Sequence, residues 1–166
     1  MPEYTTVFGS LRDYEKGRVV VVDDDPKAYV FSNVFEVANM SKPYEKVAVG
    51  KNLEYVLEVI RCEGTSEWRA TPHDEFALVM DGEVKIELLD PDDTLVDPEA
   101  NGSIGLEGEP AGQPMGHVIA RRGHQTMLPA GRCYRFHCDG LGVILLQTIE
   151  GPDTIYRWAD ICQTEA

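Results

Sequence analysis

The stretch from His73 to Asp90, HDEFALVMDGEVKIELLD, decides the fold prediction. It holds two runs of β-forming residues on either side of Asp81-Gly82. An Asp-Gly pair between two such runs is the strongest short-range signal for a β-hairpin. Both strand faces of the hairpin are largely apolar. We therefore expect one face to line a barrel interior and the other to meet another sheet or chain.

Further strands are predicted on both sides of this hairpin. In NLEYVLEVI, the apolar Tyr55, Leu57 and Val59 fall on one face, and Glu54 and Glu58 fall on the other. This period of two is typical of a half-buried strand. The second half of the chain reads as strands separated by a Pro-x-Gly turn and an Asp-Gly turn. Many short strands favour an all-β fold, and among these a jelly-roll barrel.

The chain divides into three parts. Residues 1–45 are a lead-in segment with one predicted strand, because AYVFSNVFEVA places aromatic residues on one parity. Residues 46–150 form the barrel, and within it residues 90–116 are acidic, rich in Pro and Gly, and without periodicity. That composition predicts a long surface loop. Residues 151–166 form a short C-terminal helix.

The helix prediction depends on spacing near the end of the chain. Apolar residues recur there at intervals of three and four, and Asp153 or Thr154 could cap the first turn. The residues with this spacing are Ile155, Trp158, Ala159 and Cys162.

The charge of the chain excludes one class of partner. Its 29 acidic residues against 15 basic residues give a formal net charge of −14. Binding to nucleic acid needs Lys and Arg at the phosphates, so nucleic acid is not an expected partner. The apolar runs are too short to cross a bilayer, and the N-terminus shows no secretory signal. We therefore expect a soluble, cytoplasmic protein with no membrane partner.

Two motif skeletons resemble those of the cupin superfamily, a small β-barrel often built around one metal ion. Glu75-x6-Gly82 fits the end of the first cupin motif, G-x5-H-x-H-x3–4-E-x6-G. Gly123-x5-Pro129-x-Gly131 fits the start of the second, G-x5-P-x-G-x2-H-x3-N. The resemblance implies a cupin-type jelly-roll barrel.

The metal ligands that this resemblance implies are mostly missing. The paired histidine positions hold Arg69 and Thr71, or in the other register Trp68 and Ala70. The third histidine position holds Tyr134, and only the glutamate, Glu75, is kept. An arginine repels a divalent cation, and a phenol with a pKa near 10 is a poor substitute for imidazole. We therefore expect this chain to bind no metal.

Other readings of these residues stay open. His73 and Glu75 lie two apart in a strand, so they could share a face and form an atypical metal or acid–base site with one of the other histidines, His117, His124 and His137. Alternatively, Glu75 accepts hydrogen bonds in a polar barrel mouth, with His73 as its partner. Trp68, Phe76 and Tyr134 could line an aromatic pocket, or could be ordinary core residues.

The chain also resembles the small subunit of two-component hydroquinone 1,2-dioxygenases over most of its length. The stretches that carry this resemblance are VFGSLRDYEKG, AYVFSNVFEVA, KPYEKVAVGKNLEYVLE, HDEFALVMDGEV, ARRGHQTMLPAG and GVILLQTIEG.

This resemblance implies a heterotetramer with a larger subunit that carries non-haem Fe(II) and opens the ring of hydroquinone to 4-hydroxymuconic semialdehyde. The small chain would be auxiliary and inactive when isolated, with Trp68, His73, Glu75 and Tyr134 as its pocket-lining candidates. Two alternatives are a stand-alone cupin dioxygenase or isomerase using His73 and Glu75, and a metal-free cupin that binds a small molecule.

Overall fold

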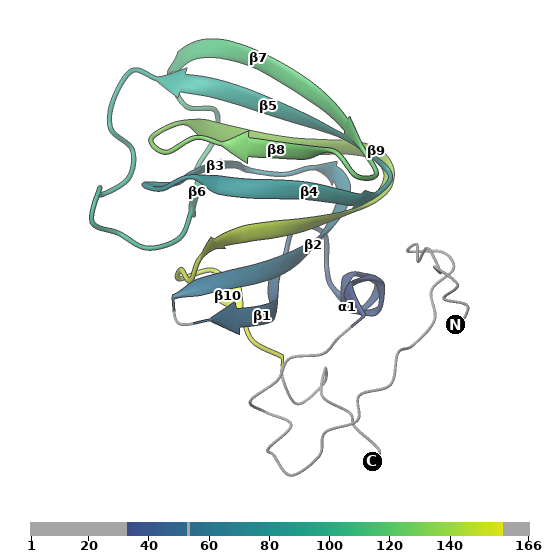
Figure 1. Ribbon diagram of the computed structural model, residues 1–166. Coiled ribbons are helices and arrows are strands. Elements are labelled where there is room, and N and C mark those ends of the chain that lie inside the picture. The colour runs from purple at the N-terminus through teal and green to yellow at the C-terminus, as the bar shows by residue number, and fades with distance from the viewer. Residues whose placement is uncertain (1–32, 53, 158–166) are drawn as a thin grey trace, which may run out of the picture.

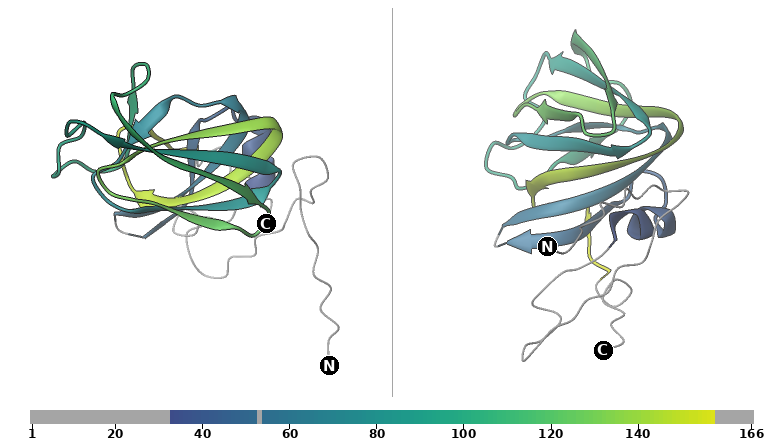
Figure 2. Two further views of the ribbon diagram at one scale, coloured as in Figure 1. Left: turned by 90° about the horizontal axis from the view of Figure 1, so that it is seen from above. Right: turned by 45° about the vertical axis from the view of Figure 1, so that its right-hand side comes forward.

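The computed structural model describes residues 33–157 with the exception of residue 53. The strands of this part form one strongly curled sheet, and a single short helix lies beside it (Figures 1 and 2). In chain order they are α1 (Val34–Met40), β1 (Lys46–Asn52), β2 (Tyr55–Thr65), β3 (Trp68–Ala70), β4 (Glu75–Asp81), β5 (Glu83–Pro91), β6 (Ile104–Leu106), β7 (Gly112–Arg121), β8 (Gln125–Leu128), β9 (Cys133–Ile149) and β10 (Thr154–Ile155).

Strand β9 organises the sheet. The first part of this 17-residue strand pairs with β3 and β5, its second part pairs with β4, and β2 pairs with it from His137 to Ile149. All four pairings are antiparallel. Because one long strand borders both halves, the sheet curls around it and encloses an interior (Figure 2).

The predicted hairpin is confirmed. Strand β4 ends at Asp81 and β5 begins at Glu83, with Gly82 at the turn in left-handed backbone with φ of 80°. A side chain at this position would bring its Cβ within 2.6 Å of the carbonyl oxygen of Leu141. Glycine is therefore required both for the turn and for the close approach of β9.

The interior of the barrel is filled by alternate residues of the strands. The Tyr134 and Phe136 rings contact each other there, with centroids 5.3 Å apart. The buried residues of this core are Ile60, Cys62, Ala77, Val79, Val84, Ile86, Ala120, Leu128, Tyr134, Phe136, Cys138, Ile144 and Leu146.

The alternation in β2 is present, but its faces are reversed relative to the usual rule. Glu58 is fully buried on the inner face of the sheet, together with Val56 and Ile60. Tyr55 and Leu57 lie on the outer face and are exposed. The alternating pattern shows that the strand has two faces, but it does not show which one points inward. Glu58 can lie on the inner face because it has a buried partner there, Lys46.

The strand predicted in AYVFSNVFEVA is wrong over its described part. Residues 34–40 form helix α1, and residues 28–32 lie outside the described residues. Asn33 caps the helix, and its side chain accepts a hydrogen bond from the Phe35 N–H at 3.0 Å. The buried Phe35, Val37 and Ala38 pack on the sheet, so the apolar residues serve a helix face. Within the described residues, no helix has the length and apolar character needed to cross a membrane.

The long surface loop predicted at residues 90–116 is only partly a loop. It contains β6, which pairs with β3, and the beginning of β7, which pairs with β5. Strand β6 has only three residues, Ile104 to Leu106, which is too short for an alternating pattern to be recognised. Ser103, just before it, is fully buried.

The predicted C-terminal helix does not begin where its spacing suggested. Thr154 and Ile155 instead form β10, parallel to the start of β1. Neither proposed cap acts as one: Asp153 pairs with Arg69, and Thr154 donates a hydrogen bond to Glu58. The other three residues of the helical pattern, Trp158, Ala159 and Cys162, lie outside the described residues.

Candidate functional site

The positions at which cupin metal ligands were expected lie inside the barrel. Arg69 in β3 pairs in register with Tyr134 in β9, and Glu75 begins β4. Thr71, Glu75 and Tyr134 are at most 1% exposed, and Arg69 is 8% exposed. The motif spacing therefore located the correct interior positions, although the side chains there differ from the usual ligands.

Glu75 is held by two hydroxyl groups. Tyr134 donates to its Oε2 at 2.6 Å, and Thr148 donates to its Oε1 at 2.5 Å. Burial raises the pKa of Tyr134 well above its usual value, and the neighbouring Glu75 carboxylate raises it further. The phenol therefore keeps its proton and acts as a donor, and both carboxylate oxygens have partners.

Arg69 occupies the other side of the same interior. Its guanidinium donates to the side chain of Ser103 at 3.2 Å and to the Ser103 carbonyl at 3.0 Å. It also donates to Glu67 at 2.7 Å and to Asp153 at 2.5 Å. One cation thus connects β3, the segment before β6 and the segment before β10.

A second buried cation joins this network through Ser103. The Lys46 Nζ donates to the Ser103 Oγ at 2.9 Å and lies 3.0 Å from the Glu58 Oε2. Thr154 donates to the other Glu58 oxygen at 2.6 Å. Lys46 is 3% exposed and Glu58 is fully buried, so this is a desolvated ion pair rather than a surface one.

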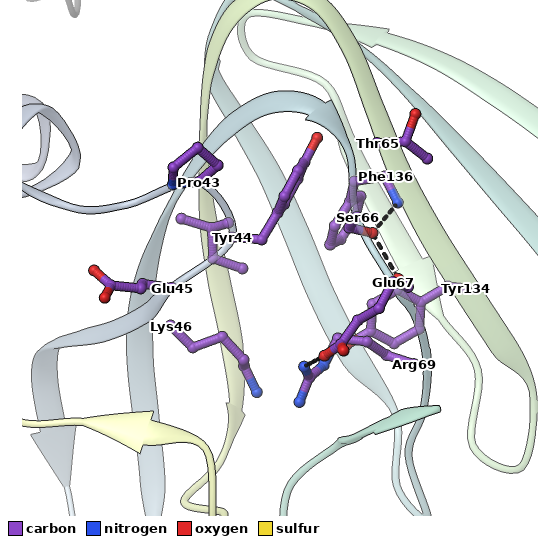
Figure 3. A pocket seen from close by; sticks show the side chains of 11 residues that line it. Pro43, Tyr44, Glu45, Lys46, Thr65, Ser66, Glu67, Arg69, Tyr134 and Phe136 are labelled. Carbon is purple, nitrogen blue, oxygen red and sulfur yellow. Dashed lines mark hydrogen bonds and ion pairs between the residues drawn. The ribbon is translucent and has the colours of Figure 1, made fainter. Parts of the chain in front are cut away.

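A cavity of about 350 Å³ opens beside these cations. Figure 3 shows Lys46 and Arg69 extending toward each other at one end, with Tyr44 and Ser66 above them. Its lining residues are Pro43, Tyr44, Glu45, Lys46, Ile60, Thr65, Ser66, Glu67, Arg69, Tyr134 and Phe136. The sequence offered no local signal for Lys46 or Ser103, whose contacts join segments far apart in the chain.

The four pocket-lining candidates are not brought together in one place. Tyr134 lines the cavity and bonds Glu75 behind it. Trp68 faces a separate cluster with Leu89 and Cys133, and the Arg135 guanidinium lies 4.5 Å from its ring centroid. The structure therefore separates the Trp68 indole from the polar interior by the thickness of β3.

His73 is occupied by backbone contacts. Its Nε2 accepts a hydrogen bond from the Gly102 N–H at 3.1 Å, and its Nδ1 lies 3.2 Å from the Asp74 carbonyl oxygen. The expected pairing of His73 with Glu75 is therefore replaced by the bonds of Glu75 to Tyr134 and Thr148. His73 thus connects the turn before β4 to Gly102, in the segment before β6.

The residues at the expected ligand positions do not fit a metal ion. Arg69 carries a positive charge, Tyr134 keeps its proton, and the lone pairs of Glu75 already accept two hydrogen bonds. Elsewhere in residues 33–157, no group of three His, Cys, Asp or Glu side chains is placed to hold one. The interior is a hydrogen-bonded polar network rather than a coordination sphere.

Replacing Tyr134 with phenylalanine tests this network. We expect the variant to lose about 1.5–3 kcal/mol of unfolding free energy, because a hydrogen bond to a buried carboxylate disappears. Urea denaturation measures the loss. Tyr55→Phe, which removes an exposed hydroxyl, is the control and should change stability by less than about 0.5 kcal/mol. Equal stability of the two variants would contradict the role given to the Tyr134–Glu75 bond.

Two solved structures resemble the chain over nearly its whole length. A crystal structure of hydroquinone 1,2-dioxygenase from Sphingomonas sp. TTNP3 with 4-hydroxybenzoate bound contains a chain that is 51% identical. The match covers 99% of this chain and 100% of that one, with a TM-score of 0.92. The chain belongs to the hydroquinone 1,2-dioxygenase family. A second dioxygenase of this family, PnpCD in complex with Cd2+ and 4-hydroxybenzonitrile, matches at 49% identity, 98% coverage of both chains and a TM-score of 0.89.

Hydroquinone 1,2-dioxygenase structures also match through a second, longer kind of chain. One from PnpCD in complex with Fe3+ is 10% identical with a TM-score of 0.60, and the match covers 83% of this chain but 38% of that one. This likeness shows that part of the longer chain shares the fold. A cupin-2 protein from Shewanella frigidimarina NCIMB 400, 12% identical over 76% of this chain and all of that one (TM-score 0.52), confirms the cupin fold. No family model and no curated protein matches the chain.

Proposed function

We propose that this chain is the auxiliary small subunit of a two-component, Fe(II)-dependent hydroquinone 1,2-dioxygenase. The complex would add dioxygen across a ring bond of hydroquinone and release 4-hydroxymuconic semialdehyde. A longer chain would hold the iron, and two copies of each chain would form a heterotetramer in the cytoplasm. The isolated small chain would bind no iron and would be inactive.

The observation that carries the proposal is the filling of the ligand positions by Arg69, Glu75 and Tyr134 in a chain that matches a dioxygenase chain from end to end. The likeness supports the reaction, because half of all positions are identical over 99% of the chain. The side chains at the expected ligand positions support a role without a metal of its own. The presence of longer chains with the same fold in related dioxygenase structures supports an iron-bearing partner.

In the complex, this chain would provide a rigid surface for its partner. The Arg69 and Lys46 contacts lock β1, β3 and the segments before β6 and β10 to one another. A barrel fixed in this way offers a rigid surface against which a partner can be positioned. The network would thus cross-link segments of the barrel that lie far apart in the chain.

Affinity purification of the tagged chain from the organism's own cells tests the assembly. We expect a longer polypeptide to co-purify, and we expect the iron to follow that polypeptide when the two are separated. Recovery of the chain alone, from cells with hydroquinone-cleaving activity in the unbound fraction, would contradict the proposal.

A further inference from the structure

One region of the outer sheet surface is apolar and bare in the described part of the chain. Leu57 in β2 pairs with Gln147 in β9, Gln147 pairs with Phe76 in β4, and Phe76 pairs with Met127 in β8. Residues paired in register point to the same side of a sheet, so these four form one row across four adjacent strands (Figure 1). We call this row, together with Tyr55, the bare outer face.

The exposure of this row is high for large apolar side chains. Tyr55 is 53% exposed, Leu57 40%, Phe76 37% and Met127 49%. None of the four positions in the row carries a charge, in a chain whose net charge is −14. Large exposed apolar side chains in one row, interrupted only by the uncharged Gln147, indicate an interaction site rather than a solvated face.

The adjoining part of the same outer surface is covered by helix α1. The next row runs Val59, Leu145, Leu78, and helix α1 packs over its beginning. Val59 is fully buried under Phe35, Val37 and Ala38 of the helix. The helix lies at one end of β2 (Figure 1) and does not reach the bare outer face, where Leu57 and Tyr55 of the same strand are exposed.

The net charge of the chain disfavours a second copy as the occupant of this face. Two copies would bring −14 against −14, and such repulsion opposes self-association. The longer chains of related dioxygenases contain a domain of this fold, so they carry a curled sheet of similar shape. Two sheets with apolar outer faces can pack face to face about 10 Å apart.

We propose that the bare outer face, built from Tyr55, Leu57, Phe76, Met127 and Gln147, is the surface that docks the longer, iron-bearing chain. This inference rests on the proposed function and adds the location of the interface to it. Gln147 and Phe76 lie in the two middle strands of the row, so they would be the central contacts of the interface.

The test is co-purification of the tagged chain, co-expressed with the longer chain, for four variants. Phe76→Asp and Gln147→Glu each place a charge in the row, and the second changes almost no shape, so it keeps the test valid if the first fails to fold. Met115→Asp places the same charge on β7, at a position that is 50% exposed and outside the row. Met40→Asp does so at the end of α1, where Met40 is 65% exposed.

We expect Phe76→Asp to weaken the complex at least about 30-fold, and Gln147→Glu about 10-fold, as charges buried at an interface centre do. Met115→Asp and Met40→Asp should bind like the parent.

Binding of Phe76→Asp and Gln147→Glu at parental affinity, or loss of binding only with Met115→Asp, would overturn the inference while the proposed function stands. Failure of the parent chain to bind the longer chain would instead defeat the proposed function. A parent chain that is a dimer alone, with Gln147→Glu a monomer, would show that the face serves self-association and would also overturn the inference.

Discussion

Lys46→Met is expected to destabilise the folded chain by about 3–5 kcal/mol, because it leaves the Glu58 carboxylate charged and buried without its cation. Glu58 is fully buried, and after the change it keeps the hydrogen bond from the Thr154 hydroxyl. The loss is a large fraction of the stability of an ordinary domain, which is about 5–15 kcal/mol. Urea or thermal denaturation followed by circular dichroism measures it.

The chain offers a matched control for this prediction. Lys51 pairs with Glu150 at the surface, where both side chains are more than a third exposed. Lys51→Met should therefore destabilise the chain far less than Lys46→Met does. The double variant Lys46→Met, Glu58→Gln should recover part of the loss, because no uncompensated charge remains. If Lys46→Met and Lys51→Met were equally stable, the buried pair would not anchor the barrel as described.

The second large effect concerns ring cleavage. We expect the isolated chain to show no oxygen uptake with hydroquinone after anaerobic addition of Fe(II), and we expect addition of the longer chain to restore uptake by several orders of magnitude. The reason is that Arg69 carries a positive charge, Tyr134 keeps its proton and each Glu75 oxygen already accepts a hydrogen bond, so these side chains do not suit iron at the expected ligand positions. An oxygen electrode, together with the absorbance of the released semialdehyde, measures the reaction.

The Tyr134→Phe variant tests whether activity depends on the longer chain or on an intact interior of this chain. Tyr134→Phe alters the interior of the chain without creating a metal ligand, so the reconstituted complex should keep its activity if the variant is folded. Substantial activity of the small chain alone, abolished by Glu75→Gln, would favour the stand-alone enzyme instead.

The local parts of the fold could be predicted from the sequence. The Asp81-Gly82 turn and the alternation in β2 are properties of neighbouring residues, and both were predicted, although the inward face of β2 is the one that carries Glu58. The motif spacing also located Glu75 and Tyr134 in the interior, where the structure joins them at 2.6 Å. Spacing succeeds here because the register of β3, β4 and β9 fixes which positions point inward.

The errors have physical causes that a single sequence conceals. Glu58 looked like a solvent-facing residue, because nothing nearby in the chain announces Lys46 as its partner across β1 and β2. Ser103 binds Arg69 from 34 positions away, and Asp153 does so from 84. Asn33 caps α1, but the aromatic alternation around it suggested a strand.

We propose that this barrel keeps the cupin shape with a polar network of Arg69, Glu75 and Tyr134 at the positions where metal ligands were expected. Anaerobic loading of the purified chain with Fe(II), removal of excess metal and elemental analysis test it most directly. We predict less than about 0.1 iron per isolated chain and about one iron per pair once the longer chain is added. One tightly held iron in the isolated 166-residue chain, lost in a Glu75→Gln variant, would contradict the account.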